Sequence, residues 1–185
     1  ELYNINLKWV QPQFLTRRAT VIINPYIRRE TEPGYETRRG GLNLPLTYKF
    51  TKDFKSSVNF YMERVLQEVN TESAELSRTS SDEYLYNKAG FLFDNEWKTS
   101  QPMFFPEQGL FAHLSYKING HIFQSNFNYQ RLLFDFRKYQ EIDNLVLAAR
   151  FEIGGISSAE KDGFVPVEDR FYSGGSMSNR GWSRA

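Results

Sequence analysis

The strongest constraint on the fold of this chain is an alternation of apolar and polar residues that recurs along most of its length. Alternation with a period of two is typical of a β-strand that buries one face, and no segment shows the period of a helix. The first and last such segments place their apolar residues at Tyr3, Ile5, Leu7 and Trp9, and at Leu145, Leu147, Ala149, Phe151 and Ile153. The pattern predicts an all-β protein.

The same reading predicts eight strands followed by a terminal loop. The strands are expected over residues 2–14, 19–28, 42–51, 56–68, 85–98, 109–118, 127–142 and 145–154, and the loop over 155–185. Long polar loops near 28–41, 70–84, 119–126 and after 154 alternate with shorter links near 15–18, 51–56, 99–108 and 140–144. Most strands span about ten residues, which is the length that a tilted strand needs to cross a bilayer.

Two architectures are compatible with this alternation. A soluble β-sandwich also alternates apolar and polar residues, but it does not account for long loops on one side and short links on the other. A transmembrane barrel has that asymmetry, carries aromatic girdles and hides polar residues in its lumen. Aromatic residues make up 16% of the chain although its mean hydropathy is −0.58. The absence of any run of 18 apolar residues excludes a transmembrane helix.

Composition argues against several other function classes. With 23 basic and 22 acidic residues the charges nearly cancel, so no nucleic-acid-binding surface is indicated. The chain has no cysteine and only two histidines, His113 and His121, and no cluster has the spacing of metal ligands. The Gly174-Gly175-Ser176 run is not a nucleophile elbow. We therefore expect neither an enzyme nor a cofactor or metal site.

A glycine-rich motif occupies the last sixteen residues, 170–185. It resembles the loop signature of the BamA/TamA surface-antigen superfamily, whose outer-membrane β-barrels insert other proteins into membranes. The strand pair expected between Tyr129 and Ile153 also resembles the strands that precede this loop in the family. The residues that fill the signature here are Phe171, Tyr172, Gly174, Gly175, Arg180, Gly181 and Trp182.

The resemblance implies a location, a function and partners. The eight strands would correspond to the fourth to eleventh of a sixteen-stranded antiparallel barrel in the bacterial outer membrane, so we expect a fragment cut at both ends with an open sheet. The implied function is non-enzymatic assembly or insertion of outer-membrane proteins. Its partners would be outer-membrane lipids and lipopolysaccharide, unfolded outer-membrane protein clients and accessory envelope lipoproteins. The alternatives are a two-partner-secretion-like pore that exports a polypeptide, and a small self-contained ligand-binding barrel.

The alternation also assigns side chains to the two faces of the sheet. Lipid should contact Leu42, Leu44, Leu46, Leu110, Ala112, Leu114, Leu145, Leu147 and Ala149, whereas Lys117, Arg131, Asp135, Arg150 and Glu152 should face the lumen. The resemblance implies that the terminal loop folds back into the lumen, where acidic side chains hold Arg180. Within this chain, the possible partners of Arg180 are Asp135 and Glu152. Replacing Arg180 with alanine should lower assembly activity, and lysine should rescue it only in part because the planar fork is lost.

Overall fold

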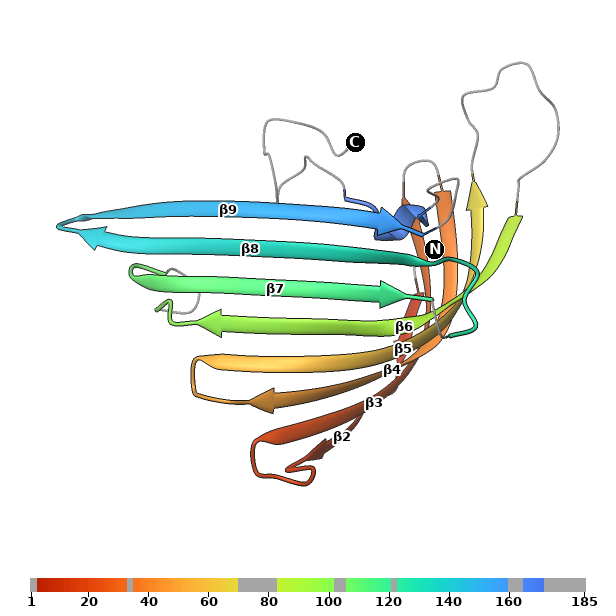
Figure 1. Ribbon diagram of the computed structural model, residues 1–185, viewed down its shortest axis with the longest axis horizontal. Coiled ribbons are helices and arrows are strands. Elements are labelled where there is room, and N and C mark those ends of the chain that lie inside the picture. Colours follow the sequence, from red (N-terminus) through yellow and green to blue (C-terminus); the bar gives the residue numbers. More distant parts are fainter. Residues whose placement is uncertain are drawn as a thin grey trace, which may run out of the picture.

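One antiparallel sheet of nine strands forms almost the whole described structure (Figure 1). The computed structural model describes residues 3–32, 35–69, 83–101, 106–120, 123–159 and 165–171. Its elements are β1 (Tyr3–Asn6), β2 (Trp9–Pro12), β3 (Ala19–Glu32), β4 (Tyr35–Lys49), β5 (Phe54–Val69), β6 (Glu83–Lys98), β7 (Gly109–Asn119), β8 (Tyr129–Ile142), β9 (Leu145–Ser158) and a short 3-10 helix, η1 (Val167–Asp169). Within these residues, no helix is long and apolar enough to span a membrane.

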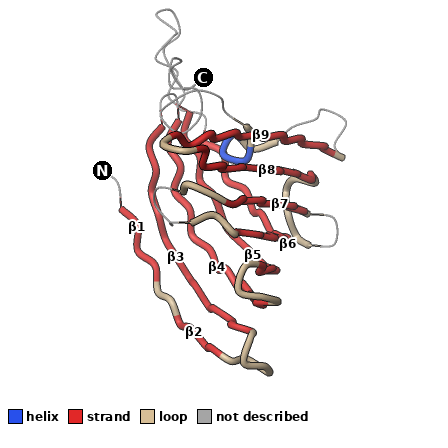
Figure 2. Tube along the Cα trace, turned by 90° about the vertical axis from the view of Figure 1, so that its left-hand side faces the viewer, coloured by secondary structure: helices blue, strands red, loops and turns tan. Residues whose placement is uncertain are grey.

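The strands follow one another across the sheet in the order β1-β3-β4-β5-β6-β7-β8-β9, and β2 pairs with β3 beside β1. The sheet is strongly curved, and η1 lies against it near β8 and β9 (Figures 1 and 2). Among the described residues, β9 pairs only with β8 and does not reach β1 or β2. The open, curved sheet confirms the prediction of a partial antiparallel barrel.

The first predicted strand, 2–14, is interrupted because of Pro25. Both β1 and β2 pair with β3 in a single register, which runs from Tyr3 opposite Arg29 to Pro12 opposite Thr20. Leu7 faces Pro25 and donates its N–H to the Pro25 carbonyl at 3.0 Å. Proline has no N–H to return, so the ladder loses one bond and the strand breaks at this point.

The prediction of a charged loop over residues 28–41 was wrong, because β3 continues to Glu32 and β4 already begins at Tyr35. Charges that suggested a solvated loop are paired between these strands. Arg29 donates to both carboxylate oxygens of Glu36, at 2.6 and 2.8 Å, and Arg39 pairs with Glu30. Likewise, β9 continues to Ser158, past its predicted end at residue 154. Cross-strand ion pairs thus join β3 and β4 where composition alone indicated a charged loop.

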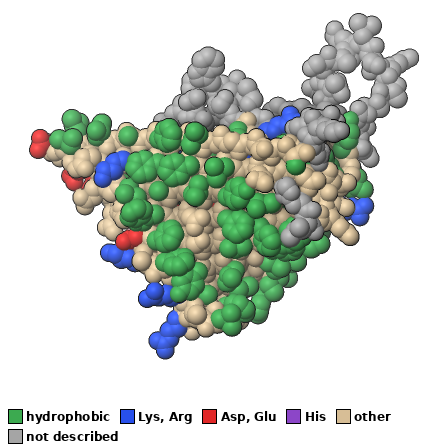
Figure 3. All heavy atoms as spheres, in the orientation of Figure 1, with side chains coloured by type: hydrophobic (Ala, Val, Ile, Leu, Met, Phe, Trp, Pro, Cys, Tyr) green, Lys and Arg blue, Asp and Glu red, His purple; other side chains and the backbone are tan. Residues whose placement is uncertain are grey.

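The two faces of the sheet differ in chemistry as the alternation predicted. The face visible in Figure 3 is covered with apolar side chains, with most charges near its margins. This outer face carries exposed apolar residues, among them Leu46, Leu114, Leu132 and Leu147. The inner face is polar: Lys117 lines its cavity, and Asp135 meets Arg150 at 3.0 Å on the same side of the sheet. The face assignment made from sequence therefore agrees with the register of the sheet.

Candidate functional site

A short segment after β9 folds back onto the inner face of the sheet. Val165 and Pro166 are buried there, and η1 follows them. The turn is closed by the N–H of Asp169, which donates to the carbonyl of Pro166 at 3.0 Å. This turn directs two adjacent carboxylates, Glu168 and Asp169, at the wall formed by β5, β6 and β7.

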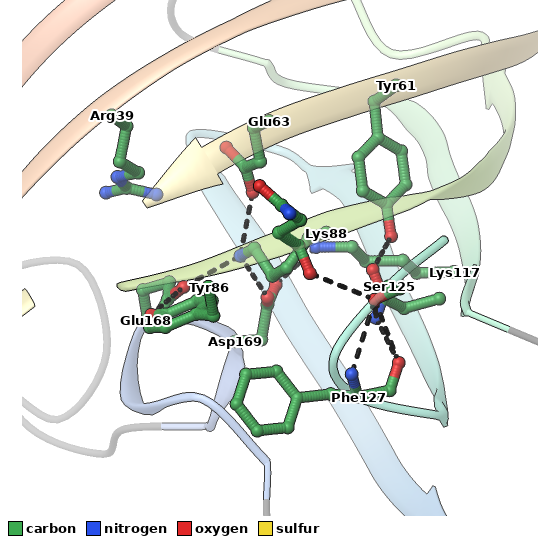
Figure 4. Close-up of polar contacts among 12 residues, drawn as sticks. Arg39, Tyr61, Glu63, Tyr86, Lys88, Lys117, Ser125, Phe127, Glu168 and Asp169 are labelled. Carbon is green, nitrogen blue, oxygen red and sulfur yellow. Dashed lines mark hydrogen bonds and ion pairs between the residues drawn. The ribbon is translucent and has the colours of Figure 1, made fainter. Parts of the chain in front are cut away.

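Two wall lysines meet these carboxylates (Figure 4). Lys88 on β6 lies 2.7 Å from Glu168, 2.8 Å from Asp169 and 2.7 Å from Glu63 of the neighbouring β5. Lys117 on β7 lies 2.5 Å from the second oxygen of Asp169. We call Glu63, Lys88, Lys117, Glu168 and Asp169 the lysine–carboxylate cluster. The side chain of Lys88 is only 1% exposed, so its charge depends on these partners.

Tyrosine hydroxyls complete the hydrogen bonding of the cluster. Tyr129 donates to Asp169 at 2.5 Å, and Tyr86 donates to Glu168 at 2.9 Å. Glu63 accepts a hydrogen bond of 2.6 Å from Tyr26, whose ring crosses β4 at Gly41. A Cβ at Gly41 would lie 3.0 Å from that hydroxyl and 2.6 Å from the Met62 carbonyl, so the glycine makes the crossing possible.

The charges around Asp169 determine its protonation state. Burial alone would raise the pKa of its carboxyl group, but the ammonium groups of Lys117 and Lys88 outweigh that effect and hold the pKa well below its usual range. Asp169 is therefore ionised at physiological pH. Because the folded-state pKa of Asp169 is depressed, its ion pairs hold the segment after β9 on the inner face at any pH above the ordinary carboxyl pKa. This stabilisation is lost only as the pH falls through the lowered pKa.

The first residue of the terminal signature also contacts the inner wall. The ring of Phe171 covers Gly154 of β9 so closely that a Cβ there would lie 2.5 Å from a ring carbon. The guanidinium of Arg131 on β8 stacks on the same ring, 4.3 Å from its centroid. Gly154 and Arg131 thus form a contact surface for Phe171, which fixes the position of the chain at the first residue of the signature.

A polar cavity of about 390 Å³ extends from the lysine–carboxylate cluster toward β1. Side-chain amides from four neighbouring strands line it, those of Asn4, Asn6, Asn24, Asn43 and Asn59, together with Lys8, Arg28 and Arg39. Among the described residues, the buried atoms Asn24 Oδ1, Asn59 Oδ1, Arg28 Nε and Arg39 Nε have no hydrogen-bond partner. Such a surface suits a hydrated lumen, since water can satisfy these groups.

The residues predicted for the terminal loop fall partly within this site. Phe171 lies on the inner face, whereas Tyr172, Gly174, Gly175, Arg180, Gly181 and Trp182 are outside the described residues. The possible Arg180 partners, Asp135 and Glu152, lie opposite each other on β8 and β9 and face inward. Asp135 already pairs with Arg137 at 2.6 Å and with Arg150 at 3.0 Å, and Glu152 pairs with Arg150. Their contact with Arg180 stays a prediction.

Sequence reasoning missed the lysine–carboxylate cluster itself. Lys117 was placed on the lumenal face, but neither it nor Lys88 was linked to a partner. A usable signal was the acidic pair Glu168-Asp169 just before the signature, set against lysines at inward positions of β6 and β7. Among the described residues, no group of three or more His, Cys, Asp or Glu side chains is arranged to hold a metal ion.

Comparisons with known proteins agree with this architecture. A model of the Omp85 superfamily domain matches residues 2–185. A search of curated proteins found no match. Among solved structures, BamA from Haemophilus ducreyi lacking POTRA domains 1-3 is similar, with a TM-score of 0.84, 16% sequence identity and coverage of 99% of this chain. The chain spans 38% of the length of that protein, and the likeness shows a shared fold.

Proposed function

Because the chain belongs to the Omp85 superfamily, we propose that the barrel it helps to form assembles and inserts other β-barrel proteins in the bacterial outer membrane. The observation that carries the proposal is the acidic segment that fastens the start of the signature loop to the inner wall. An ordered loop entry, held by Lys88 and Lys117, would keep the glycine-rich signature at a defined place inside the barrel.

The proposed mechanism is non-covalent. An unpaired strand edge is a template for strand addition, so a client strand can pair with an opened edge of the barrel and enter the membrane from there. The apolar outer face would contact the lipid of the bilayer during this process. Unfolded outer-membrane proteins would be the clients, and accessory envelope lipoproteins are further proposed partners.

Reconstitution tests this function directly. The full-length protein that contains this chain is placed in liposomes, an unfolded β-barrel client is added, and its folding is followed by heat-modifiable electrophoretic mobility. We expect client folding at least about tenfold faster than in liposomes that contain an unrelated barrel, which corresponds to about 1.4 kcal/mol of barrier. Arg180→Ala should lower this rate while the barrel stays folded.

Two outcomes would contradict the proposal. Client folding at the rate of the control liposomes would remove the insertase activity. Recovery of the client in the aqueous interior of the vesicles, instead of in the bilayer, would favour the polypeptide-exporting pore.

A further inference from the structure

An outward-facing hollow of about 530 Å³ lies where β7 ends level with Gly90 in the middle of β6. The chain after β7 covers the rest of that strand. The N–H of Gly120 donates to the Ala89 carbonyl at 2.9 Å, and the N–H of Asn126 donates to the Asn87 carbonyl at 3.0 Å. Because this segment is not a strand, it leaves a recess against the outer face.

Apolar side chains form the floor and one wall of the hollow. The ring of Phe123, from the segment after β7, lies 5.4 Å from the ring of Phe60 and 5.3 Å from that of Phe91, centroid to centroid. Leu42 and Met62 continue the floor, and half of the Met62 surface is exposed. A lining of this kind takes up hydrocarbon and offers little to a purely polar ligand.

The hollow is open because Gly40 has no side chain. A Cβ placed on Gly40 would have a single neighbour within 4 Å, the Cγ1 of Ile27 at 4.0 Å. The backbone there accepts a larger residue without strain, since its φ is not in the left-handed region. The recess can therefore be filled experimentally without disturbing the sheet.

Among the described residues, Arg64 places a cationic side chain at the edge of the hollow, beyond its apolar floor. Arg64 lies opposite Gly40 on one side and Asn87 on the other, one row beyond the apolar row of Leu42, Met62 and Ala89. It is exposed, and within the described part of the chain no hydrogen bond or ion pair engages it. The arginines of the next row, Arg29 and Arg38, are by contrast paired with Glu36. Arg64 thus presents a guanidinium that no described side chain engages, where the outer face turns from apolar to charged.

We propose that this hollow binds one lipid with a phosphate headgroup, its acyl chain against Leu42, Met62 and Phe123 and its phosphate on Arg64. A guanidinium matches a phosphate in charge and in bidentate geometry. A free phosphate would leave the apolar floor unused, and a neutral hydrocarbon would leave Arg64 unused, so an anionic lipid fits both halves of the site. The proposal rests on the membrane-spanning barrel and not on the assembly activity.

Binding of lipid A to the full-length protein in dodecyl maltoside, measured by native mass spectrometry, tests this site. Arg64→Gln should weaken lipid A binding about tenfold, because the amide keeps a neutral hydrogen-bond donor but loses the charge and the bidentate fork. Lys138→Gln is the matched control, because Lys138 is another exposed cation on the outer face, near the β8–β9 turn, and should leave binding unchanged. Equal weakening by both variants would show general charge attraction and overturn the site.

Further binding measurements distinguish the contribution of the acyl chain from that of the phosphate. Gly40→Leu keeps Arg64 but fills the recess, so it should abolish binding of lipid A and of dephosphorylated lipid A. Dephosphorylated lipid A should bind the wild type about tenfold more weakly than lipid A and should not respond to Arg64→Gln. Inorganic phosphate alone should not compete. Wild-type affinity in Gly40→Leu, or competition by inorganic phosphate, would contradict the proposal, whatever the assembly assay shows.

Discussion

Replacing Lys88 with methionine should destabilise the barrel by about 3–5 kcal/mol, because removing one partner of a buried ion pair leaves the other charges uncompensated. Lys88 is 1% exposed and lies within 2.8 Å of Glu63, Glu168 and Asp169. Methionine keeps most of the volume, so the loss is electrostatic. Urea unfolding of the full-length protein in lipid vesicles measures this change.

A surface lysine on the adjacent strand provides the matched control. Lys55 also pairs with a carboxylate of the neighbouring strand, Glu96, at 3.0 Å, but its side chain is 48% exposed. Lys55→Met should therefore change stability by no more than about 1 kcal/mol. Combining Lys88→Met with Glu168→Gln should recover part of the loss, since one unpaired carboxylate is removed. Equal effects of Lys88→Met and Lys55→Met would contradict the role given to the cluster.

The second large effect is expected at Gly90, the glycine between Tyr61 of β5 and Asn119 of β7. Tyr61 reaches across this bare position and donates to Asn119 at 2.8 Å. A Cβ at Gly90 would lie 1.9 Å from the Ile118 carbonyl oxygen, which is backbone and can move only if the β6–β7 pairing opens. Gly90→Ala should therefore destabilise the barrel by about 3 kcal/mol, at the upper end of overpacking effects.

Gly155→Ala is the control for this prediction, because nothing lies within 4 Å of a Cβ at that position. An alanine there should be neutral or slightly stabilising, as expected for glycine replacement within a strand. Urea unfolding in lipid vesicles is again the measurement. If Gly90→Ala unfolded at the same urea concentration as Gly155→Ala, the close β6–β7 approach would not exist in the folded protein.

The alternation of residue types was sufficient to predict most of the fold. It located most of the strands and assigned side chains such as Leu147 and Lys117 to opposite faces, whereas the open antiparallel sheet was expected from the family resemblance. It failed where tertiary pairing overrides local composition. Arg29 on β3 pairs with Glu36 on β4, and this contact is set by the register of the two strands, which no local pattern contains.

The candidate site was harder to predict for a related reason. Lys88 is separated from Glu168 by 80 positions and from Asp169 by 81, and only the fold-back of the segment after β9 brings them together. Gly154 likewise gave no local sign that it receives the ring of Phe171. Such contacts depend on which inward-facing residues of neighbouring strands lie side by side. That arrangement is known only once the strand register is known.

Crosslinking of two cysteines introduced at positions 171 and 154 tests the central claim, that the segment before the signature lies against the inner wall. The chain has no cysteine, so within it the pair Phe171→Cys with Gly154→Cys is unique. We expect efficient linkage by a short thiol crosslinker in the full-length protein in membranes. The pair Phe171→Cys with Gly155→Cys should not crosslink, because residue 155 points to the outer face. Equal linkage in both pairs, or linkage in neither, would contradict the docked arrangement.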